Sequence, residues 1–343
     1  MNAQIHKISE HNQLNLKNNL NKVMNKTAKL RFPFFIFTEL LLVILSSCIN
    51  TALLPVVESK ELTAITATTA TCWGNVPVDA GSAVTARGAC WSTKPNPTTS
   101  NTKSTATAGT GEFSTAITGL TAGTTYYIRC YATNSTGTAY GSQLTFKTLY
   151  ADNDGNVINT ITIGTQTWMA ENLKSTKFQN GNIIANVTDP SAWRTLTTAS
   201  YSSYNNNSAY LKSYGNLYNW FAVNDTRNIA PKGWHVPTQA EWTTLINYLG
   251  GISVAGDKLK ETGNVNWIGI YSGATNSSGF NALPGGILST NSFTNIGITG
   301  QWWSATEVDT NTAWNLSLSN ASPLVVYENN SKQNGLSIRC ILN

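Results

Sequence analysis

Charged residues are scarce in this sequence of 343 residues, because Asp, Glu, Lys and Arg together make up only 11% of it. That fraction is less than half of the roughly one quarter found in average soluble proteins. With 41% apolar and 10% aromatic residues, the composition excludes a disordered chain, a coiled coil and a protein with many membrane spans. Polarity comes instead from Thr, Asn, Ser and Gly, which favours an extracellular, β-rich protein.

Net positive charge is also nearly absent beyond the first 48 residues. The formal net charge is +5, but residues 1–48 hold six of the 22 Lys and Arg and two of the 17 Asp and Glu. The rest of the chain is therefore almost neutral, and it lacks the basic surface that binds nucleic acid.

Motifs for catalysis and metal binding are lacking as well. Of the three histidines, His6 and His11 lie near the start of the chain, so His235 is the one left for catalysis. This excludes a zinc site built from several histidines, and no C-x-x-C or G-x-S-x-G motif occurs. A Ser-His-Asp set using His235 is less favoured than a histidine that braces the turn before a helix cap. We therefore expect no enzyme activity, no cofactor and no metal ion.

One acidic segment invites comparison with calcium-binding loops. In Asp152-Asn-Asp-Gly-Asn156 the glycine is the fourth residue, whereas an EF-hand loop has its glycine at the sixth position. We expect a plain turn there.

The chain begins with the layout of a secretory signal. Lys26, Lys29 and Arg31 precede an apolar run over 32–45, which Ser-Ser-Cys48 follows directly. As a helix the run would be about 21 Å long, short of the ~30 Å hydrocarbon core of a bilayer, so a permanent membrane span is not expected.

Leu-Ser-Ser-Cys at the end of this run resembles a bacterial lipobox, in which the cysteine is acylated and becomes the mature N-terminus. The resemblance implies a lipoprotein signal over 1–47, a lipid on Cys48 and a lipidated tether over 48–56. Translation from Met24 would give the signal an ordinary length. A cleaved signal with an incidental cysteine is the alternative. We expect a lipid anchor that holds the protein in the outer membrane or at the cell surface.

Residues 57–148 are expected to form an all-β sandwich. Short β-favouring runs alternate with turn clusters, and no helical period occurs. In Thr125–Asn134 alternation places Tyr126 and Cys130 on one face. This segment, with Leu120 before it, resembles the tyrosine corner and following strand of a fibronectin type III domain. The resemblance implies a spacer or adhesion module.

The sandwich contains three cysteines, Cys72, Cys90 and Cys130, so they cannot all pair within it. An export compartment permits a disulfide between Cys72 and Cys130. Cys130 can equally be a small buried hydrophobic residue. Connectivity cannot be read from sequence, and both alternatives stay open.

A helix is predicted to begin at Gln239. Thr238 and Glu241 have the spacing of a capping box, in which each side chain accepts from the backbone of the other residue. The apolar residues that follow form one stripe at helical spacing, and a glycine pair ends the helix. The stripe consists of Trp242, Leu245, Ile246 and Leu249, and the stop of Gly250 and Gly251.

Seven ordered motifs over 150–343 resemble the Fibrobacter succinogenes major paralogous domain. They are Trp168–Leu173, Tyr214–Trp220, Gly233–Trp242, Ala255–Lys260, Gly279–Pro284, Trp302–Ala305 and Ser337–Cys340. Two of them are also similar to the formylglycine-generating fold, a relative of the C-type lectin fold. The resemblance implies a compact α+β domain with a loop-rich surface.

The resemblance also bears on chemistry. The family often has a cysteine where this chain has Ala230, so Cys340 is expected to be unpaired and buried. Formylglycine-type oxidation needs two redox-active cysteines, which the domain does not have. The calcium and sugar triplet of C-type lectins is absent too.

Aromatic and amide side chains are dense in this second part, which makes a glycan site chemically plausible. Most of its tryptophans are expected in the core, whereas the loop with Trp193, Tyr201 and Tyr204 is the predicted exposed ligand surface. The leading hypothesis is a non-catalytic recognition domain of the cell envelope that binds polysaccharide. A structural or protein-docking role is the alternative, and an enzyme of unknown type ranks third.

Overall fold

The computed structural model describes residues 53–269, 273–289 and 292–343. The predicted signal, Met24, Cys48 and most of the predicted tether lie outside the described residues. No helix in the described part of the chain is both long and apolar enough to cross a bilayer.

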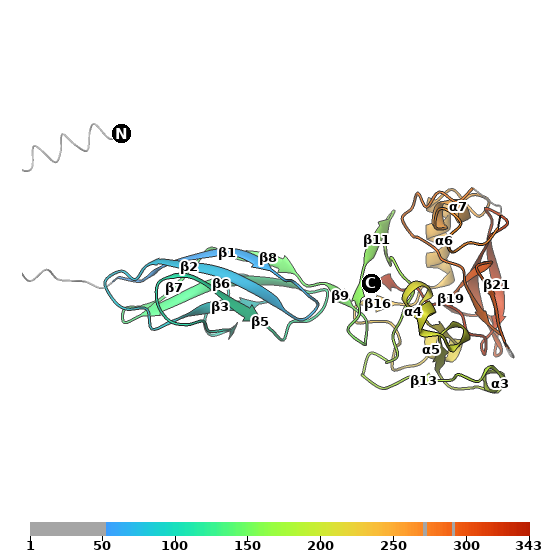
Figure 1. Ribbon diagram of the computed structural model, residues 1–343, viewed down its shortest axis with the longest axis horizontal. Coiled ribbons are helices and arrows are strands. Elements are labelled where there is room, and N and C mark those ends of the chain that lie inside the picture. The colour runs from blue at the N-terminus through green and yellow to red at the C-terminus, as the bar shows by residue number, and fades with distance from the viewer. Residues whose placement is uncertain (1–52, 270–272, 290–291) are drawn as a thin grey trace, which may run out of the picture. The chain divides into compact units, whose positions relative to one another are not determined.

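Residues 56–147 form an antiparallel sandwich of two sheets, drawn in blue to green in Figure 1. One sheet has the order β1 (Val56–Thr63), β2 (Ala70–Val78) and β5 (Gly111–Ile117). The other has the order β4 (Thr102–Lys103), β3 (Ala86–Ser92), β6 (Thr125–Asn134) and β7 (Gly137–Tyr140), and β8 (Leu144–Lys147) also pairs with β6.

The expected sandwich is therefore confirmed, and the alternation in β6 explains why it forms. Tyr126, Ile128 and Cys130 face the core between the sheets together with Leu120. The Tyr126 hydroxyl accepts a hydrogen bond from the Thr121 N–H at 3.0 Å, the kind of link to upstream backbone that a tyrosine corner makes.

The second part of the chain is built on four small sheets. The two-stranded sheet pairs β9 (Tyr150–Ala151) with β10 (Val157–Ile158). The next has the order β11 (Thr160–Ile163), β12 (Gln166–Met169), β22 (Ile341–Leu342) and β16 (Trp234–His235), and a third has β13 (Ala185–Asn186), β14 (Ser200–Ser202) and β15 (Leu217–Tyr218).

The largest sheet has five strands. Their order is β18 (Phe293–Ile296), β17 (Gly285–Leu288), β19 (Thr299–Glu307), β20 (Thr312–Ser319) and β21 (Val325–Ser331). Between the strands lie short helices, namely α3 (Pro190–Trp193), the 3₁₀ turn η1 (Tyr204–Asn206), α4 (Ser208–Tyr214), α5 (Trp220–Val223), α6 (Gln239–Tyr248) and α7 (Ala255–Leu259).

The expected α+β, lectin-like architecture is not supported, because the described chain is mostly sheet and its helices are few. The physical reason lies in the connecting segments. They are rich in Asn, Ser, Thr and Gly, which favour turns and caps over long helices, and α6 alone among the described helices exceeds seven residues.

Helix α6 confirms the predicted capping box. Thr238 accepts a hydrogen bond from the Glu241 N–H, and the Glu241 carboxylate accepts one from the Thr238 N–H at 2.8 Å. The predicted stripe is buried and packs with Trp302, Leu316 and other residues of the five-stranded sheet.

Glu241 also contacts His235, and His235 contacts Asn343. The helix cap, the turn before it and Asn343 are therefore linked. One Glu241 oxygen lies 2.7 Å from His235 Nε2, and Asn343 Oδ1 lies 2.6 Å from His235 Nδ1. Partial burial by itself would raise the pKa of Glu241. Hydrogen bonds from Thr238 and His235 outweigh that effect and hold the pKa below its usual value.

Replacing Glu241 should therefore have a pH-dependent effect on stability. A carboxylate whose folded pKa is depressed stabilises the protein above its unfolded pKa, and the contribution is lost as pH falls through the folded pKa. We expect Glu241→Gln to lower the free energy of unfolding by about 1 kcal/mol near pH 7. The deficit should shrink below about pH 4.

Urea denaturation at several pH values checks this, with Glu112→Gln on an exposed strand position as the control. A deficit that stays constant down to about pH 3 would contradict the assigned role of the carboxylate.

Candidate functional site

The centre of the second part is a buried arginine. Arg339 is 1% exposed, and its Nε and Nη2 both donate to Asn172 Oδ1, at 3.1 and 2.8 Å. Its Nη1 donates to the Phe280 carbonyl. The guanidinium lies over the rings of Phe280, 4.2 Å from the centroid, and Trp302, at 5.9 Å. Cation–π contacts of this kind compensate in part for lost hydration.

Asn172 connects this arginine to two other segments and to Ser337 in the arginine's own segment. Its Oδ1 also accepts from Trp302 Nε1 at 2.8 Å, and its Nδ2 donates to the Tyr214 carbonyl at 2.8 Å and to Ser337 Oγ at 3.2 Å. Five of the seven sequence motifs thus meet at one amide–guanidinium contact.

The arrangement is buried, since Asn172, like Arg339, is almost completely shielded from solvent. Burial lowers the pKa of Arg339 to about 9, so the group stays protonated at neutral pH. Among the described residues no carboxylate forms an ion pair with it, and amide and ring contacts take that place.

The sequence-predicted aromatic loop is also used for packing. Trp193 is fully buried and donates to the Val187 carbonyl at 2.9 Å, and Tyr204 is 5% exposed. Both belong to a small core cluster with Leu217 and Leu288. Tyr201 is half-buried and tilts against the Tyr218 ring. The prediction of an exposed surface is therefore wrong for Trp193 and Tyr204, because strands that are distant in sequence cover these rings.

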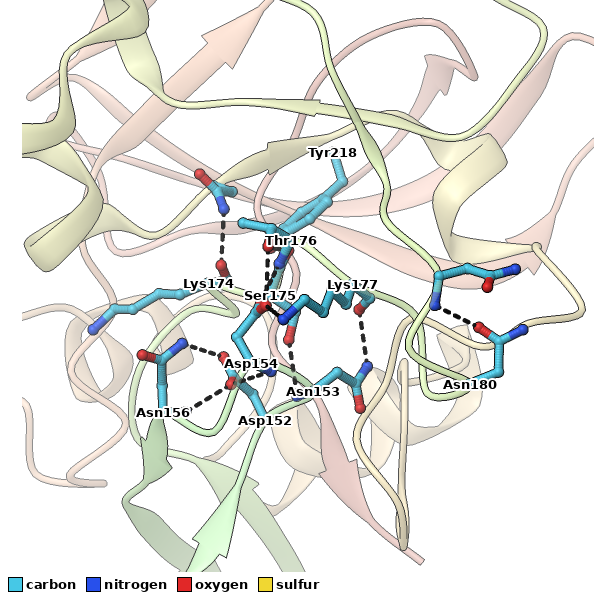
Figure 2. A network of polar contacts seen from close by, with 12 residues as sticks. Asp152, Asn153, Asp154, Asn156, Lys174, Ser175, Thr176, Lys177, Asn180 and Tyr218 are labelled. Atoms are coloured by element: carbon cyan, nitrogen blue, oxygen red, sulfur yellow. Dashed lines mark hydrogen bonds and ion pairs between the residues drawn. The ribbon is translucent and has the colours of Figure 1, made fainter.

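The acidic segment 152–156 forms a turn whose carboxylates bind donors of the chain itself (Figure 2). Asp152 accepts from the N–H of Asp154 at 3.0 Å and of Asn156 at 2.9 Å, and also from the Asn156 amide. Asp154 accepts from Thr176 and lies 3.3 Å from Lys177 Nζ. No group of three or more His, Cys, Asp or Glu suited to a metal ion occurs in the described ranges.

His235 and Cys340 are the two remaining candidates for chemistry, and both side chains make structural contacts. His235 contacts Glu241 and Asn343 through its two ring nitrogens, which fits the predicted bracing role. Cys340 is fully buried in the core, as expected, and this burial raises the pKa of its thiol.

A polar cluster that sequence reasoning missed lies on the five-stranded sheet, where Gln301, Asn315 and Ser317 are buried beside Trp303. Strand register pairs Gln301 with Ser317, and Asn315 with Glu328, while Asn330 follows two residues after Glu328. Directly paired residues share a face, as do residues two apart in one strand. These five residues, which we name the polar face, lie on the side of the sheet opposite to α6.

The hydrogen bonds within the polar face are long. Asn330 Nδ2 donates to Gln301 Oε1 at 3.3 Å and to Asn315 Oδ1 at 3.4 Å. Asn315 Nδ2 donates to Glu328 at 3.4 Å. Such distances lie beyond the usual range of 2.7–3.2 Å, so these groups interact only weakly with one another.

One sequence signal could have indicated this surface. In Asn315-Leu-Ser-Leu-Ser319 polar and apolar residues alternate strictly, which is typical of a strand with one polar side. The contributions of Gln301 and Asn330 come from other strands and depend on register.

Removing the Asn172 amide should destabilise the second part strongly. Asn172→Ala leaves two guanidinium N–H groups and the Trp302 N–H without an acceptor in the core. We expect the free energy of unfolding to fall by about 3 kcal/mol or more. Urea denaturation followed by tryptophan fluorescence measures this.

Asn159→Ala is the matched control. Asn159 is exposed, and its side-chain amide donates one hydrogen bond, to the Glu171 carboxylate. Its effect should stay within about 0.5 kcal/mol. A loss below about 1 kcal/mol for Asn172→Ala would show that the arginine does not depend on this amide.

The comparisons with solved structures give similarity over part of the chain. The sensor domain of the anti-sigma factor RsgI4 of Pseudobacteroides cellulosolvens is 24% identical, with 29% of this chain and 99% of that chain covered and a TM-score of 0.23. A fibronectin type III domain of human fibronectin type III domain containing protein 3 is 18% identical, with 28% and 87% covered and a TM-score of 0.22. At these TM-scores neither likeness assigns a fold or a function to this chain.

None of the curated proteins matches the chain. The model of one family does match, and its description is Fibrobacter succinogenes major domain. It covers residues 161–342 and with them all seven motifs, Arg339 and Asn172 included. Because this match covers more than half of the sequence, the protein belongs to the Fibrobacter succinogenes major domain family.

Proposed function

We propose that the second part of the chain is a non-catalytic recognition domain that binds a neutral polysaccharide on the polar face. The observation that carries the proposal is a cluster of amide groups on one side of a sheet whose hydrogen bonds to one another are long, while Asn330 Oδ1 also accepts from the Asn334 amide at 2.5 Å. Amides both donate and accept hydrogen bonds, as sugar hydroxyls do, so the two kinds of group are complementary.

Exposure differs across the polar face in a way that suits binding. Glu328 and Asn330 are half-buried and can be reached from solvent, whereas Gln301 and Asn315 are buried behind them. The inner amides interact only weakly with the outer side chains, so the outer groups can exchange these long hydrogen bonds for bonds to a ligand. Val326 is 45% exposed, and because it pairs with Ser317 it adds apolar surface on the same side for sugar C–H groups.

The charge of the polar face favours an uncharged ligand. Its one ionisable side chain is the Glu328 carboxylate, which accepts from hydroxyl groups and repels anionic polymers. It includes no Lys or Arg that would attract phosphate or sulfate groups.

The rest of the chain, in this proposal, places the domain at the cell envelope. A lipid on Cys48 anchors the protein at the outer membrane or cell surface, and the sandwich of residues 56–147 acts as a spacer of the fibronectin type III kind. Support comes from the order of basic residues, apolar run and Leu-Ser-Ser-Cys in the sequence.

Glycan binding should depend on Asn330. The full chain is screened on an array of plant, host and microbial polysaccharides, and calorimetry then measures affinity for the strongest ligand. Asn330→Ala should weaken binding about tenfold, because a ligand loses one or two hydrogen bonds. Asn329→Ala should leave affinity within about twofold, because Asn329 lies on the other side of the same strand.

Two negative results have different meanings. Failure of the folded wild-type chain to bind any glycan would contradict polysaccharide recognition. Binding that both variants retain equally would keep recognition but remove the polar face as its site.

The anchor is tested in growing cells with an alkyne fatty acid. Wild-type protein should incorporate the label, Cys48→Ala should lose it, and Cys90→Ala should keep it because Cys90 is buried in the sandwich. Protease treatment of intact cells then separates a surface location from a periplasmic one. Equal labelling of wild type and Cys48→Ala would contradict the anchor.

A further inference from the structure

Two sulfur atoms meet in the core of the sandwich. Cys72 lies on β2 in one sheet and Cys130 on β6 in the other, and both side chains are fully buried. Their Sγ atoms are 3.6 Å apart, although the residues are 58 positions apart in sequence.

Gly74 makes room for this contact. A Cβ atom on Gly74 would lie 2.6 Å from Cys130 Sγ, closer than real Cβ atoms approach their neighbours. The missing side chain therefore leaves the space that the Cys130 sulfur occupies beside β2.

The third cysteine of the sandwich is directed away from the pair. In the register of β3 and β6, Ala89 is opposite Cys130 and Cys90 is opposite Arg129. Neighbouring residues of a strand point to opposite faces, so Cys90 faces away from the core that contains Cys72 and Cys130. Its Sγ contacts the Arg129 carbonyl at 3.5 Å.

We propose that Cys72 and Cys130 form a disulfide that joins the two sheets when the chain folds in the presence of a disulfide oxidant. One of the two thiols, as its thiolate, attacks a sulfur of the oxidant and releases one oxidant thiol. The second thiolate then attacks the mixed disulfide, forms the Cys72–Cys130 bond and releases the other oxidant thiol. Two protons leave the cysteines, and two electrons reduce the oxidant disulfide to two thiols.

The burial of both sulfurs dictates when this happens. An external disulfide cannot reach them once the sheets have closed, so exchange takes place during folding. For the same reason the finished bond resists reductants as long as the sandwich stays folded. Formation in the cell rests on the proposed export, because exported proteins meet oxidising conditions, whereas the sulfur geometry does not depend on export.

Tryptic mapping tests the proposal because each of the three cysteines falls in its own peptide. The expected peptides are 61–87 with Cys72, 88–103 with Cys90 and 130–147 with Cys130. The full chain is unfolded under reducing conditions, refolded with a mixture of oxidised and reduced glutathione, alkylated in denaturant and digested. Mass spectrometry should find peptide 61–87 linked to 130–147, with Cys90 alkylated.

A linkage through Cys90, or complete alkylation of Cys72 and Cys130, would overturn the proposal. The same mapping on Cys90→Ser should still give the linked peptides, whereas Cys72→Ser should give none. Because glutathione replaces the cellular oxidant here, the result is independent of export and of glycan binding.

Thermal unfolding provides a second measurement that needs no variant. A cross-link over a long loop restricts the unfolded chain and stabilises the folded state. Refolded wild type should therefore show a sandwich Tm about 10 °C or more above that of the same protein kept reduced throughout. Equal Tm values for protein shown to be linked and for reduced protein would contradict a stabilising clamp.

Discussion

A guanidinium group removed from water is costly unless hydrogen bonds and rings surround it, and the second part of this protein is organised around one that is so surrounded. Asn172 accepts two of the Arg339 N–H groups, and Phe280 and Trp302 stack on the cation. Each partner comes from a different segment, so these segments must all be in place together. Strand β22 begins two residues after Arg339 and pairs with β12 and β16, so the arginine is also tied to this sheet.

The packing of aromatic side chains in the core limits which groups remain at the surface. Most of the largest rings, with Trp193, Trp242 and Trp302 among them, are buried in the core, whereas Trp314 is half-buried. The proposed binding site is accordingly built from amide, hydroxyl and carboxylate groups. The low charge content of the chain and the polar face are the two features on which the proposal of an uncharged, hydroxyl-rich ligand rests.

The sandwich is stabilised by other means. Its core is a layer of alternating inward residues from two sheets, with Tyr126 hydrogen-bonded to upstream backbone and the sulfurs of Cys72 and Cys130 in contact. The proposed disulfide would join the two sheets of the sandwich, whereas a buried polar network joins segments of the second part that are distant in sequence.

Interactions between residues close in sequence could be predicted from the sequence alone. The capping box of Thr238 and Glu241, the stripe of α6, the alternation in β6 and the turn at 152–156 depend on neighbours a few positions away. The tertiary structure alone decided the rest. Asn172 and Arg339 are 167 residues apart, the polar face combines three strands, and Trp193 and Tyr204 are buried because distant strands cover them. Composition can count rings and amides, but which of them water reaches depends on how the sheets pack, and no short-range pattern contains that information.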